Sequence, residues 1–429
     1  MGKVNAAVRE AVVRRHRPDY QIILYMGLLM LLGLIVMYAI GPQRANVLNN
    51  SYGTDFYTST YFFIKQGISL LFAITAFIIM ATMPYGFIRQ HAVKILFIGL
   101  GACALLFFAG NLLHLDSIAK CELNGTACRW FNLGPFGSIQ PAEILKFGLL
   151  VYTAGFLGMR IKQGLVNDFN RTLVPIGVLV GIASLFIIVI QKDMGTGLAM
   201  LAIIASMLMV GGVSRRVGAI LTAIGLVVGI LFVVMAPHRI ERVMTFMAGD
   251  NSMTTGDADA NYHINHAKIA IGSGGFDGVG IGNSVQATGY LPEAINDSVF
   301  AIMGETFGFV GLTLILLIFT ALLLRLLKIT EHLPDLWMKL VVAGVFGWLA
   351  SHAILNVAAM IGVVPLTGVT LPLLSFGGTS MIFIAGALGL AFQLSRYTVH
   401  GSTHKEMNNE DIGSRRGVGR TRYASTRRN

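Results

Sequence analysis

Charged residues are scarce in this chain. Only 12% of its 429 residues are Asp, Glu, Lys or Arg, whereas 55% are hydrophobic. Soluble domains carry about 25% charged residues, so the composition excludes an ordinary soluble enzyme. Apolar runs of roughly twenty residues recur, and that length lets a helix cross a bilayer. Short alternating strands of the kind that form membrane barrels are not visible. The sequence therefore predicts an all-α polytopic membrane protein.

Cysteine is also rare, with three residues in the chain. Cys103 lies inside an apolar run and is expected to pack there. Cys121 and Cys128 flank a short polar loop, CELNGTAC. They either form a disulfide or remain free thiols, since the predicted topology places them outside the cytoplasm, where disulfides can form. A structural zinc would need four ligands, and these are absent.

About ten apolar runs are long enough to span a bilayer. The predicted spans are Tyr20–Gly41, Tyr61–Thr82, Val93–Leu113, Gln140–Gly158, Thr172–Ile190, Gly195–Val213, Val217–Pro237, Ser298–Leu327, Met338–Met360 and Leu371–Leu394. The first run is too long for a cleaved signal sequence and is predicted to stay as a helix. Lys and Arg gather in the tails and in alternate short connections, which marks these segments as cytoplasmic. Both termini are therefore predicted to be cytoplasmic.

The chain is predicted to have three parts. Residues 1–19 form a basic cytoplasmic tail, residues 20–396 a ten-helix membrane domain, and residues 397–429 a second basic, disordered tail. Residues 238–297 form a large extracytoplasmic loop between the seventh and eighth spans, too long for a simple tether. The net charge of +11 lies mainly in the tails. This placement favours anionic lipid head groups over nucleic acid, which needs a folded basic surface.

The predicted outer connections carry polar motifs, so a site is expected to face outward. In RWFNLGPFGSIQPAEILK, residues 129–146, Glu143 and Lys146 share a helix face and enter an apolar run. Such a pair either holds helices together or belongs to a functional site. In QKDMGTG, residues 191–197, Asp193 either caps the following helix or lines a cavity open to the outside.

Cations also occur in the long outer loop. Arg239 and Arg242 share a helix face in HRIERVMTF, and Lys268 follows them. They either bind a phosphate or pyrophosphate group or extend to the membrane interface as ordinary basic residues do. His263 and His266 lie in the same loop. Two histidines are too few to predict a metal site.

Two glycine- or proline-rich stretches interrupt the apolar pattern. The first, IGSGGFDGVGIGNS, residues 271–284, fits neither the P-loop nor the dinucleotide-binding pattern. It is predicted to be a tight, flexible loop near substrate or a partner. The second, residues 356–381, contains Pro365 and Pro372 and is predicted to be bent or re-entrant. Such backbone is tolerated at membrane depth only where protein or a water-filled cavity satisfies it.

Three acids occur in LPEAINDSVFAIMGE, residues 291–305. Glu293 is expected to shape the turn after Pro292. Asp297 is placed at the start of a helix, where the helix N-terminus favours its ionised form. Glu305 lies about two turns, or roughly 12 Å, further along that helix. It is expected to brace a cavity by pairing with a buried base such as Lys146.

In this order, six blocks resemble the SEDS family of peptidoglycan polymerases (shape, elongation, division and sporulation). They are RWFNLGPFGSIQPAEILK, QKDMGTG, HRIERVMTF, AIGSGGFDGVGIGNSVQ, YLPEAINDSVFAIMGETFG and PLTGVTLPLLSFGGTS. The resemblance implies a ten-helix fold and glycosyl transfer from lipid II to a nascent glycan strand. It places the protein in the cytoplasmic membrane of a bacterium with an outward-facing site. A class B penicillin-binding protein and other division or elongation proteins are the implied partners.

The resemblance also implies roles for residues. Asp297 matches the family's essential carboxylate. The other candidate substrate-binding residues are Arg129, Glu143, Lys146, Gln191, Asp193, Arg239, Arg242, Lys268, Glu305 and Ser375. Lys192 and Phe376 stand where the family commonly has Pro and Tyr, so fine substrate contacts differ. LPEA and the basic N-terminal extension resemble the division protein FtsW more than the elongation protein RodA, which predicts a septal role.

The implied reaction is an inverting displacement. The 4-hydroxyl of the N-acetylglucosamine of lipid II attacks a glycan whose reducing end carries undecaprenyl pyrophosphate, and a β-1,4 bond forms. This chemistry needs a base for the hydroxyl and positive charge for the pyrophosphate. Asp297 is the expected base, and Arg239, Arg242, Lys268 or a divalent cation (Mg or Mn) the expected positive charge. The alternatives are the elongation polymerase of the same family, a lipid II flippase and a non-enzymatic scaffold.

Overall fold

The structure is a computed structural model that describes residues 16–115, 117–121, 127–134, 137–214, 216–219 and 258–399. Most of the predicted seventh span, Val217–Pro237, lies outside these residues. Arg239, Arg242 and most of both tails lie outside them as well. The predicted division into two tails and a ten-helix domain therefore remains a prediction.

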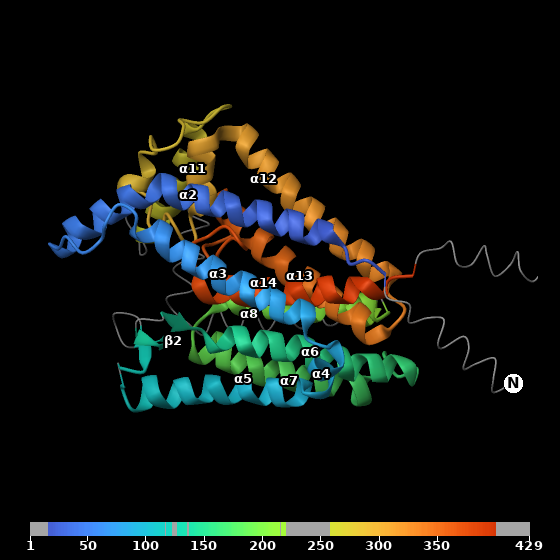
Figure 1. Cartoon of the computed structure of the whole chain (residues 1–429). Coiled ribbons are helices and arrows are strands. Elements are labelled where there is room, and N and C mark those ends of the chain that lie inside the picture. The colour runs from blue at the N-terminus through green and yellow to red at the C-terminus, as the bar shows by residue number, and fades with distance from the viewer. Residues whose placement is uncertain are drawn as a thin grey trace, which may run out of the picture.

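The described chain folds mainly into long helices (Figure 1). They are α2 (Tyr20–Tyr52), α3 (Tyr61–Thr82), α4 (Tyr85–Gln90), α5 (Ala92–Leu106), α6 (Pro141–Lys162), α7 (Val174–Ser184), α8 (Met194–Val210), α11 (Ala258–Ser273), α12 (Val299–His332), α13 (Leu336–Met360) and α14 (Gly378–Leu394). The π-helical turns are η1 (Phe107–Leu112) after α5, and η3 (Phe169–Leu173) and η4 (Leu185–Ile190) on either side of α7. Short 3-10 turns are η6 (Gln286–Thr288) and η7 (Ser395–Tyr397).

Among the described residues, 8 helical stretches are long and apolar enough to cross a membrane, and α8 is a shorter apolar helix. This confirms the prediction of a polytopic all-α membrane protein. Two predicted boundaries are wrong. α2 continues through Pro42 to Tyr52, since a proline is tolerated inside a membrane helix. α14 begins at Gly378 rather than at Leu371, because turns occupy the preceding residues up to that point.

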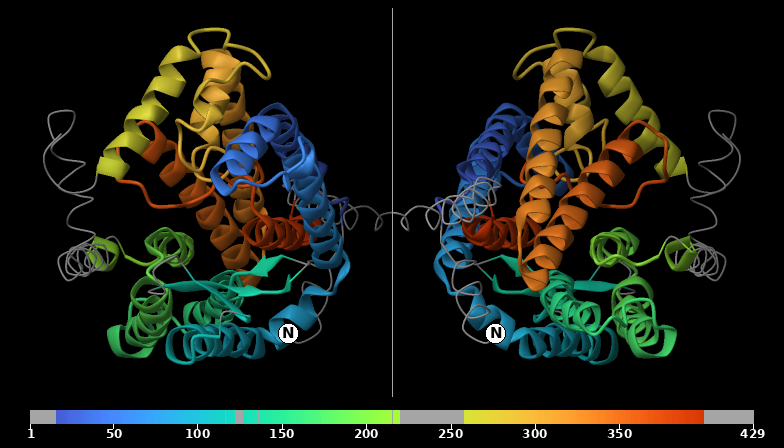
Figure 2. Two further views of the ribbon diagram at one scale, coloured as in Figure 1. Left: turned by 90° about the vertical axis from the view of Figure 1, so that its left-hand side faces the viewer. Right: turned by 90° about the vertical axis from the view of Figure 1, so that its right-hand side faces the viewer.

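The centre of the bundle contains α13 and α14 (Figures 1 and 2). α2, α11 and α12 lie on one side of them, and α5, α6 and α7 lie on the other. The most apolar window is 67% buried in α13 and 72% buried in α14, but only 28% buried in α3 and α12. The outer helices therefore present most of their apolar surface outward, as lipid-facing helices do.

Neighbouring helices come closest at glycine. A Cβ on Gly99 of α5 would lie 2.7 Å from the Cα of Leu145 in α6, and one on Gly148 of α6 would lie 2.8 Å from the Cα of Leu96. Lipid is as apolar as these helix surfaces, so close backbone packing is a main source of helix association in membranes. The two glycines let α5 and α6 pack in this way.

A small antiparallel sheet precedes α6, which the sequence analysis did not predict. Its strands are β1 (Ala119–Cys121), β2 (Cys128–Asn132) and β3 (Ser138–Ile139), in the order β1-β2-β3. Cys121 and Cys128 form a disulfide between β1 and β2, which decides between the two alternatives left open above. Cys103 is a buried free thiol, as expected.

The glycine-rich loop pairs with a break in α12. At Gly308 the backbone is non-helical (φ 64, ψ −165), so the helical hydrogen bond between Glu305 and Phe309 is open. The loop supplies both missing partners: Val279 N–H donates to the Glu305 carbonyl (2.9 Å), and the Gly275 carbonyl accepts from Phe309 N–H (3.0 Å). The predicted tight loop is therefore held against α12 by backbone hydrogen bonds.

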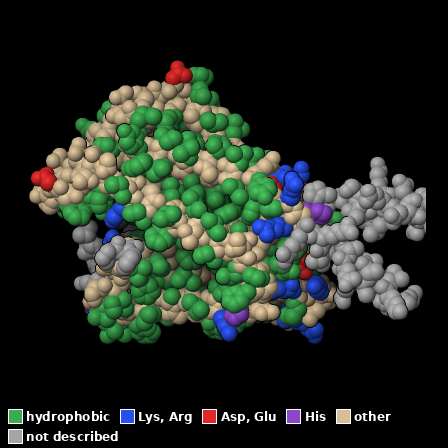
Figure 3. All heavy atoms as spheres, in the orientation of Figure 1, with side chains coloured by type: hydrophobic (Ala, Val, Ile, Leu, Met, Phe, Trp, Pro, Cys, Tyr) green, Lys and Arg blue, Asp and Glu red, His purple; other side chains and the backbone are tan. Residues whose placement is uncertain are grey.

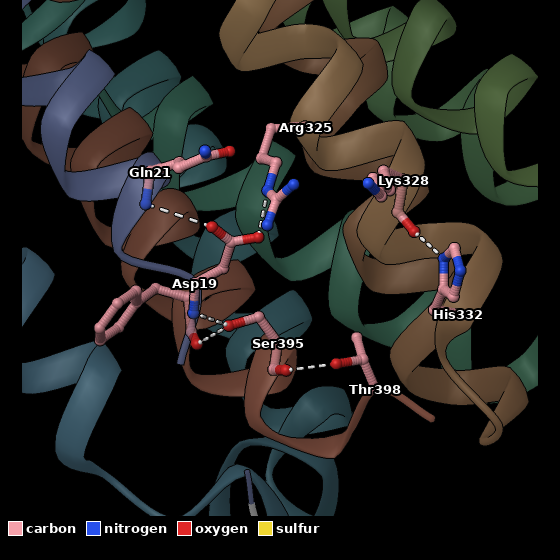
Figure 4. Close-up of polar contacts among 8 residues, drawn as sticks. Asp19, Gln21, Arg325, Lys328, His332, Ser395 and Thr398 are labelled. Carbon is pink, nitrogen blue, oxygen red and sulfur yellow. Dashed lines mark hydrogen bonds and ion pairs between the residues drawn. The ribbon is translucent and has the colours of Figure 1, made fainter. Parts of the chain in front are cut away.

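The two ends of the described chain meet at one end of the bundle. His16 N–H donates to the Arg396 carbonyl (2.8 Å), and Asp19 N–H donates to the Ser395 hydroxyl (2.9 Å). The Arg325 guanidinium of α12 pairs with the Asp19 carboxylate (Figure 4). Figure 3 shows Lys and Arg side chains gathered at this end, beside a wide hydrophobic belt. Residues 16–19 and 395–396 therefore lie together at one end of the bundle.

Gly99→Ala is expected to destabilise the protein, because the new Cβ collides with the backbone of α6. Overpacking of this kind costs about 1–3 kcal/mol. Gly101→Ala is the matched control, since a Cβ at Gly101 of the same helix meets nothing within 4 Å. Thermal unfolding of both variants in detergent measures the difference. Equal melting temperatures for Gly99→Ala and Gly101→Ala would contradict the packing described here.

Candidate active site

Asp297 lies in the turn that leads into α12. The turn bends at Glu293, whose φ of 48° is in the left-handed region. The Glu293 carbonyl accepts hydrogen bonds from the N–H groups of Asn296 (2.9 Å) and Ser298 (3.2 Å). Ser298 is the N-cap residue of α12. Glu293 therefore shapes the turn, as predicted, and the turn places Asp297 directly before the N-cap residue of α12.

The Asp297 carboxyl is partly exposed but has mostly protein around it. Burial raises its pKa from 3.8 to about 7, and the negative charges of Glu293 and Asp193 act in the same direction. Arg129 opposes them. The sequence analysis expected the helix N-terminus to favour the ionised form, and this expectation is wrong because desolvation outweighs it. A pKa near 7 suits a group that must accept a proton at neutral pH.

The bent segment 361–377 faces Asp297 from the other side. A Cβ on Gly368 would lie 3.6 Å from Oδ2 of Asp297. The Asn356 amide of α13 donates to the carbonyls of Asp297 and Val369, each at 2.7 Å. The predicted bent segment is therefore confirmed, and one side chain ties it to the turn before α12. The sequence analysis missed Asn356, although an amide inside an apolar helix was the available signal.

Asp193 is the N-cap residue of α8. Its carboxylate accepts hydrogen bonds from the Thr196 N–H (2.9 Å) and the Thr196 hydroxyl (2.8 Å). It also accepts one from the Gln140 amide at the start of α6 (2.8 Å). The capping alternative is confirmed. Because its charge also acts on Asp297, the same carboxylate contributes to the electrostatics of the site.

Arg129 of β2 holds the short connection before α8. Its guanidinium donates to the carbonyls of Gln191 (3.0 Å) and Lys192 (3.1 Å). Lys192 has a φ of 53°, so the chain turns sharply there. The Gln191 side chain is buried. Arg129 therefore fixes the backbone next to Asp193, and its positive charge reaches Asp297 as well.

Glu143 and Lys146 form a fully buried ion pair inside the bundle. Lys146 Nζ lies 2.9 Å from Glu143 Oε1 and 3.4 Å from His352 Nε2 of α13. The ammonium also lies 4.7 Å from the centre of the Trp348 ring. The pair therefore joins α6 to α13, which fits the helix-holding alternative. The ion pair contacts His352 of α13. One helical turn further along α13, Asn356 contacts the turn that contains Asp297.

Glu305 does not pair with Lys146, so this expectation is wrong. Its carboxylate accepts hydrogen bonds from the Ser284 hydroxyl (2.5 Å) and from the N–H groups of Val285 (2.9 Å) and Gln286 (3.3 Å). Glu305 therefore holds the end of the glycine-rich loop against α12. Sequence spacing did not indicate this contact, because the break at Gly308 brings the loop to this part of α12.

The remaining candidates make no hydrogen bond or ion pair with Asp297 within the described residues, or lie outside those residues. Lys268 of α11 is exposed and lies against the end of α13, where a Cβ on Gly362 would be 3.0 Å from its Nζ. The buried Ser375 hydroxyl accepts from the Leu371 N–H (2.8 Å), which gives it a role in holding segment 361–377. Arg239 and Arg242 lie outside the described residues.

The two histidines of α11 contact the neighbouring turns. His263 Nε2 lies 2.5 Å from the Ser298 hydroxyl, and His266 Nδ1 lies 2.7 Å from Gln286 Oε1. Burial lowers the pKa of His263, with Glu293 acting against that shift. Among the described residues, no group of three or more His, Cys, Asp or Glu is arranged to hold a metal ion.

We call Arg129, Asp193, Glu293 and Asp297 the outer charge cluster, because each acts electrostatically on Asp297 or is Asp297 itself. With one cation and three acids its formal charge is 1 − 3 = −2. Such a cluster suits proton acceptance by a carboxylate of raised pKa. It does not suit a pyrophosphate, so positive charge for that group must come from elsewhere.

Comparison with known proteins identifies relatives over most of the chain. A family model described as cell cycle protein, covering FtsW, RodA and SpoVE, matches residues 20–400. Stage V sporulation protein E of Bacillus subtilis is 32% identical over 390 residues, which are 90% of this chain and 99% of that protein. A probable peptidoglycan glycosyltransferase FtsW of Taylorella equigenitalis is 31% identical over 375 residues, with 86% and 94% covered.

Solved structures have the same fold. A chain of a peptidoglycan synthase complex that coordinates polymerisation and crosslinking superimposes with a TM-score of 0.68 at 23% identity, covering 88% of this chain and 98% of that one. The rod shape determining protein RodA of Thermus thermophilus superimposes with a TM-score of 0.59 at 21% identity, covering 89% and 98%. At these identities the likeness concerns the fold alone.

The buried Glu143–Lys146 pair generates a stability prediction. Lys146→Met leaves the Glu143 carboxylate unpaired in the bundle, and such a loss costs about 3–5 kcal/mol. The double variant Glu143→Gln/Lys146→Met removes both charges and is expected to be more stable than Lys146→Met alone. Thermal unfolding in detergent compares the two. A double variant that unfolds at or below the melting temperature of Lys146→Met would contradict this dependence of one charge on the other.

Proposed function

The chain belongs to the cell cycle protein family of FtsW, RodA and SpoVE, and from this premise we propose that it is a peptidoglycan glycosyltransferase that polymerises lipid II into β-1,4 glycan strands. The observation that carries the proposal is the partly exposed Asp297 carboxyl with a pKa of about 7. It lies before the start of α12, whereas Asp19 and Val399, the described residues next to the two tails, contact the other end of that helix. If the basic tails are cytoplasmic, the site faces outward.

Asp297 acts as the base in this proposal. Its carboxylate accepts the proton from the 4-hydroxyl of the N-acetylglucosamine of lipid II. The hydroxyl oxygen forms a bond to the anomeric carbon of the growing glycan while the bond to pyrophosphate breaks, which inverts the configuration. General base catalysis of this kind contributes typically about 10²–10⁴-fold. The exposed Glu293 needs no catalytic part, because pyrophosphate leaves without a strong acid.

Positive charge for the leaving pyrophosphate is assigned to residues outside the outer charge cluster. Lys268 is exposed on α11 beside the end of α13, and Arg239 and Arg242 precede it in the same outer loop. Arg129 has another task, because its guanidinium already binds two backbone carbonyls. A divalent cation bound together with the pyrophosphate would supply the same charge stabilisation.

A class B penicillin-binding protein is the proposed partner, and the bacterial cytoplasmic membrane at the division septum is the proposed location. Two observations support this. A chain of similar fold belongs to a synthase complex that coordinates polymerisation and crosslinking. Several relatives that are about 30% identical over most of the chain are named as probable FtsW glycosyltransferases, and LPEA resembles the same division branch.

Asp297→Asn is expected to abolish polymerisation, because the amide cannot accept the hydroxyl proton. The assay uses the complex with its transpeptidase in proteoliposomes that contain labelled lipid II. Asp277→Asn is the matched control, since Asp277 is an exposed acid in the glycine-rich loop. Undiminished polymer from Asp297→Asn would contradict the assignment of the base. In the parent protein, translocated monomer without polymer would indicate a flippase, and neither product would indicate a scaffold.

The polymerisation rate is expected to rise about tenfold per pH unit below pH 7 and to level off above it, because only ionised Asp297 accepts a proton. Glu293→Gln removes a negative charge that raises this pKa, so the acidic limb should move to lower pH. Initial rates between pH 5.5 and 8.5, about 1.5 units on either side of the predicted midpoint, measure both profiles. A limb that stays in place or moves to higher pH in Glu293→Gln would contradict the electrostatic account.

A further inference from the structure

The position of Asp297 depends on contacts made by its backbone. The outer charge cluster acts on its carboxyl through space: Glu293 and Asp193 repel the ionised form and Arg129 attracts it. None of these charges fixes where the carboxyl lies. The backbone carbonyl of Asp297, however, accepts a hydrogen bond of 2.7 Å from the buried Asn356 amide of α13.

Asn356 joins two separate parts of the site with one amide group. The second carbonyl that it binds, also at 2.7 Å, is that of Val369. Gly368, the residue before Val369, lies beside the Asp297 carboxyl, since a Cβ built on it would be 3.6 Å from Oδ2. The amide therefore sets the distance between the turn before α12 and the bent segment 361–377. Asparagine suits this task because its nitrogen carries two donors.

The amide oxygen of Asn356 shows that this arrangement costs free energy. Within the described chain, the buried Asn356 Oδ1 has no hydrogen-bond partner. A buried acceptor left without a partner costs about 1–3 kcal/mol. An apolar side chain would avoid this cost but would leave the two carbonyls without their donor. The presence of an amide here is therefore explained by the two carbonyls and not by packing.

The helix that carries Asn356 is held at a second point by a buried ion pair. His352 lies one helical turn earlier on the same face of α13, and its Nε2 contacts Lys146. Lys146 is paired with Glu143 of α6. The face of α13 that reaches Asp297 is thus held at a second point by the buried ion pair. α13 is also one of the two most buried spans of the described chain, which limits its movement.

We propose that Asn356 is a positioning residue for the base: it holds the Asp297 carboxyl against the turn at Gly368 by binding the carbonyls on both sides. The inference rests on the proposed function, since it presupposes that Asp297 accepts the proton. Misplacing a reacting group by about 1 Å costs on the order of 10²-fold in rate. Substrate binding should be affected much less, because Asn356 is buried.

The test uses Asn356→Leu, which is close in size but lacks both donors, in the complex with its transpeptidase in proteoliposomes with lipid II. The expected result is a kcat lower by about 10–100-fold with a KM for lipid II within about threefold of the parent. The acidic limb of the pH profile should also move below 7, because a freed Asp297 becomes better hydrated. Asn356→Ser keeps one donor and should lose less activity.

Leu349→Ala is the matched control, since Leu349 is a buried apolar residue of the same helix. It is expected to lower the melting temperature without moving the acidic limb. A kcat for Asn356→Leu within about threefold of the parent would overturn the proposal. A second result would also overturn it: both Asn356 variants lose kcat, but the acidic limb of the pH–rate profile does not move. That result would indicate general destabilisation. If Asn356→Leu does not fold, Asn356→Ser decides: a kcat equal to that of the parent together with an unmoved acidic limb would overturn the proposal. Activity retained by Asp297→Asn would instead refute the proposed base.

Discussion

Backbone groups freed from helical hydrogen bonds inside an apolar bundle have no water to bind, and this constraint shapes the whole site. At the break in α12 the glycine-rich loop supplies the partners. At the connection before α8 the Arg129 guanidinium binds the freed carbonyls, and at segment 361–377 the Asn356 amide does so. Each interruption of a helix is therefore matched by a loop or a polar side chain. The connection before α8 and segment 361–377 lie beside Asp297, whereas the break at Gly308 lies further along α12.

The electrostatics of the site follow from the same arrangement. Asp297 lies close to protein on most sides, and desolvation with two neighbouring acids raises its pKa to about 7. The outer charge cluster is acidic overall, so proton acceptance and pyrophosphate departure are assigned to different groups. Lys268, which lies against the end of α13, is proposed to belong to the second group. Among the charges that act on Asp297, Arg129 lowers its pKa, and burial together with the two acids outweighs that effect.

Much of the fold could be predicted from composition and apolar run length. Eight long apolar helices, the Asp193 cap and the Glu293 turn agree with the sequence analysis. The extension of α2 to Tyr52 and the small sheet do not, because proline in a membrane helix and three short strands give no periodic signal. The predicted partner of Glu305, Lys146, was also wrong. The observed partners belong to the glycine-rich loop, which packs on α12 at the break at Gly308.

The sequence by itself determined that the chain is a polytopic helical membrane protein and which acids were candidates for its site. Apolar length and the high cost of charge in a bilayer are local properties, so they can be read from residue order. Only the tertiary structure decided the pKa of Asp297, the disulfide, and the joining of residues 297, 356 and 369 by one amide. Desolvation and hydrogen bonding depend on which distant segments come together, and residue order does not specify those distances.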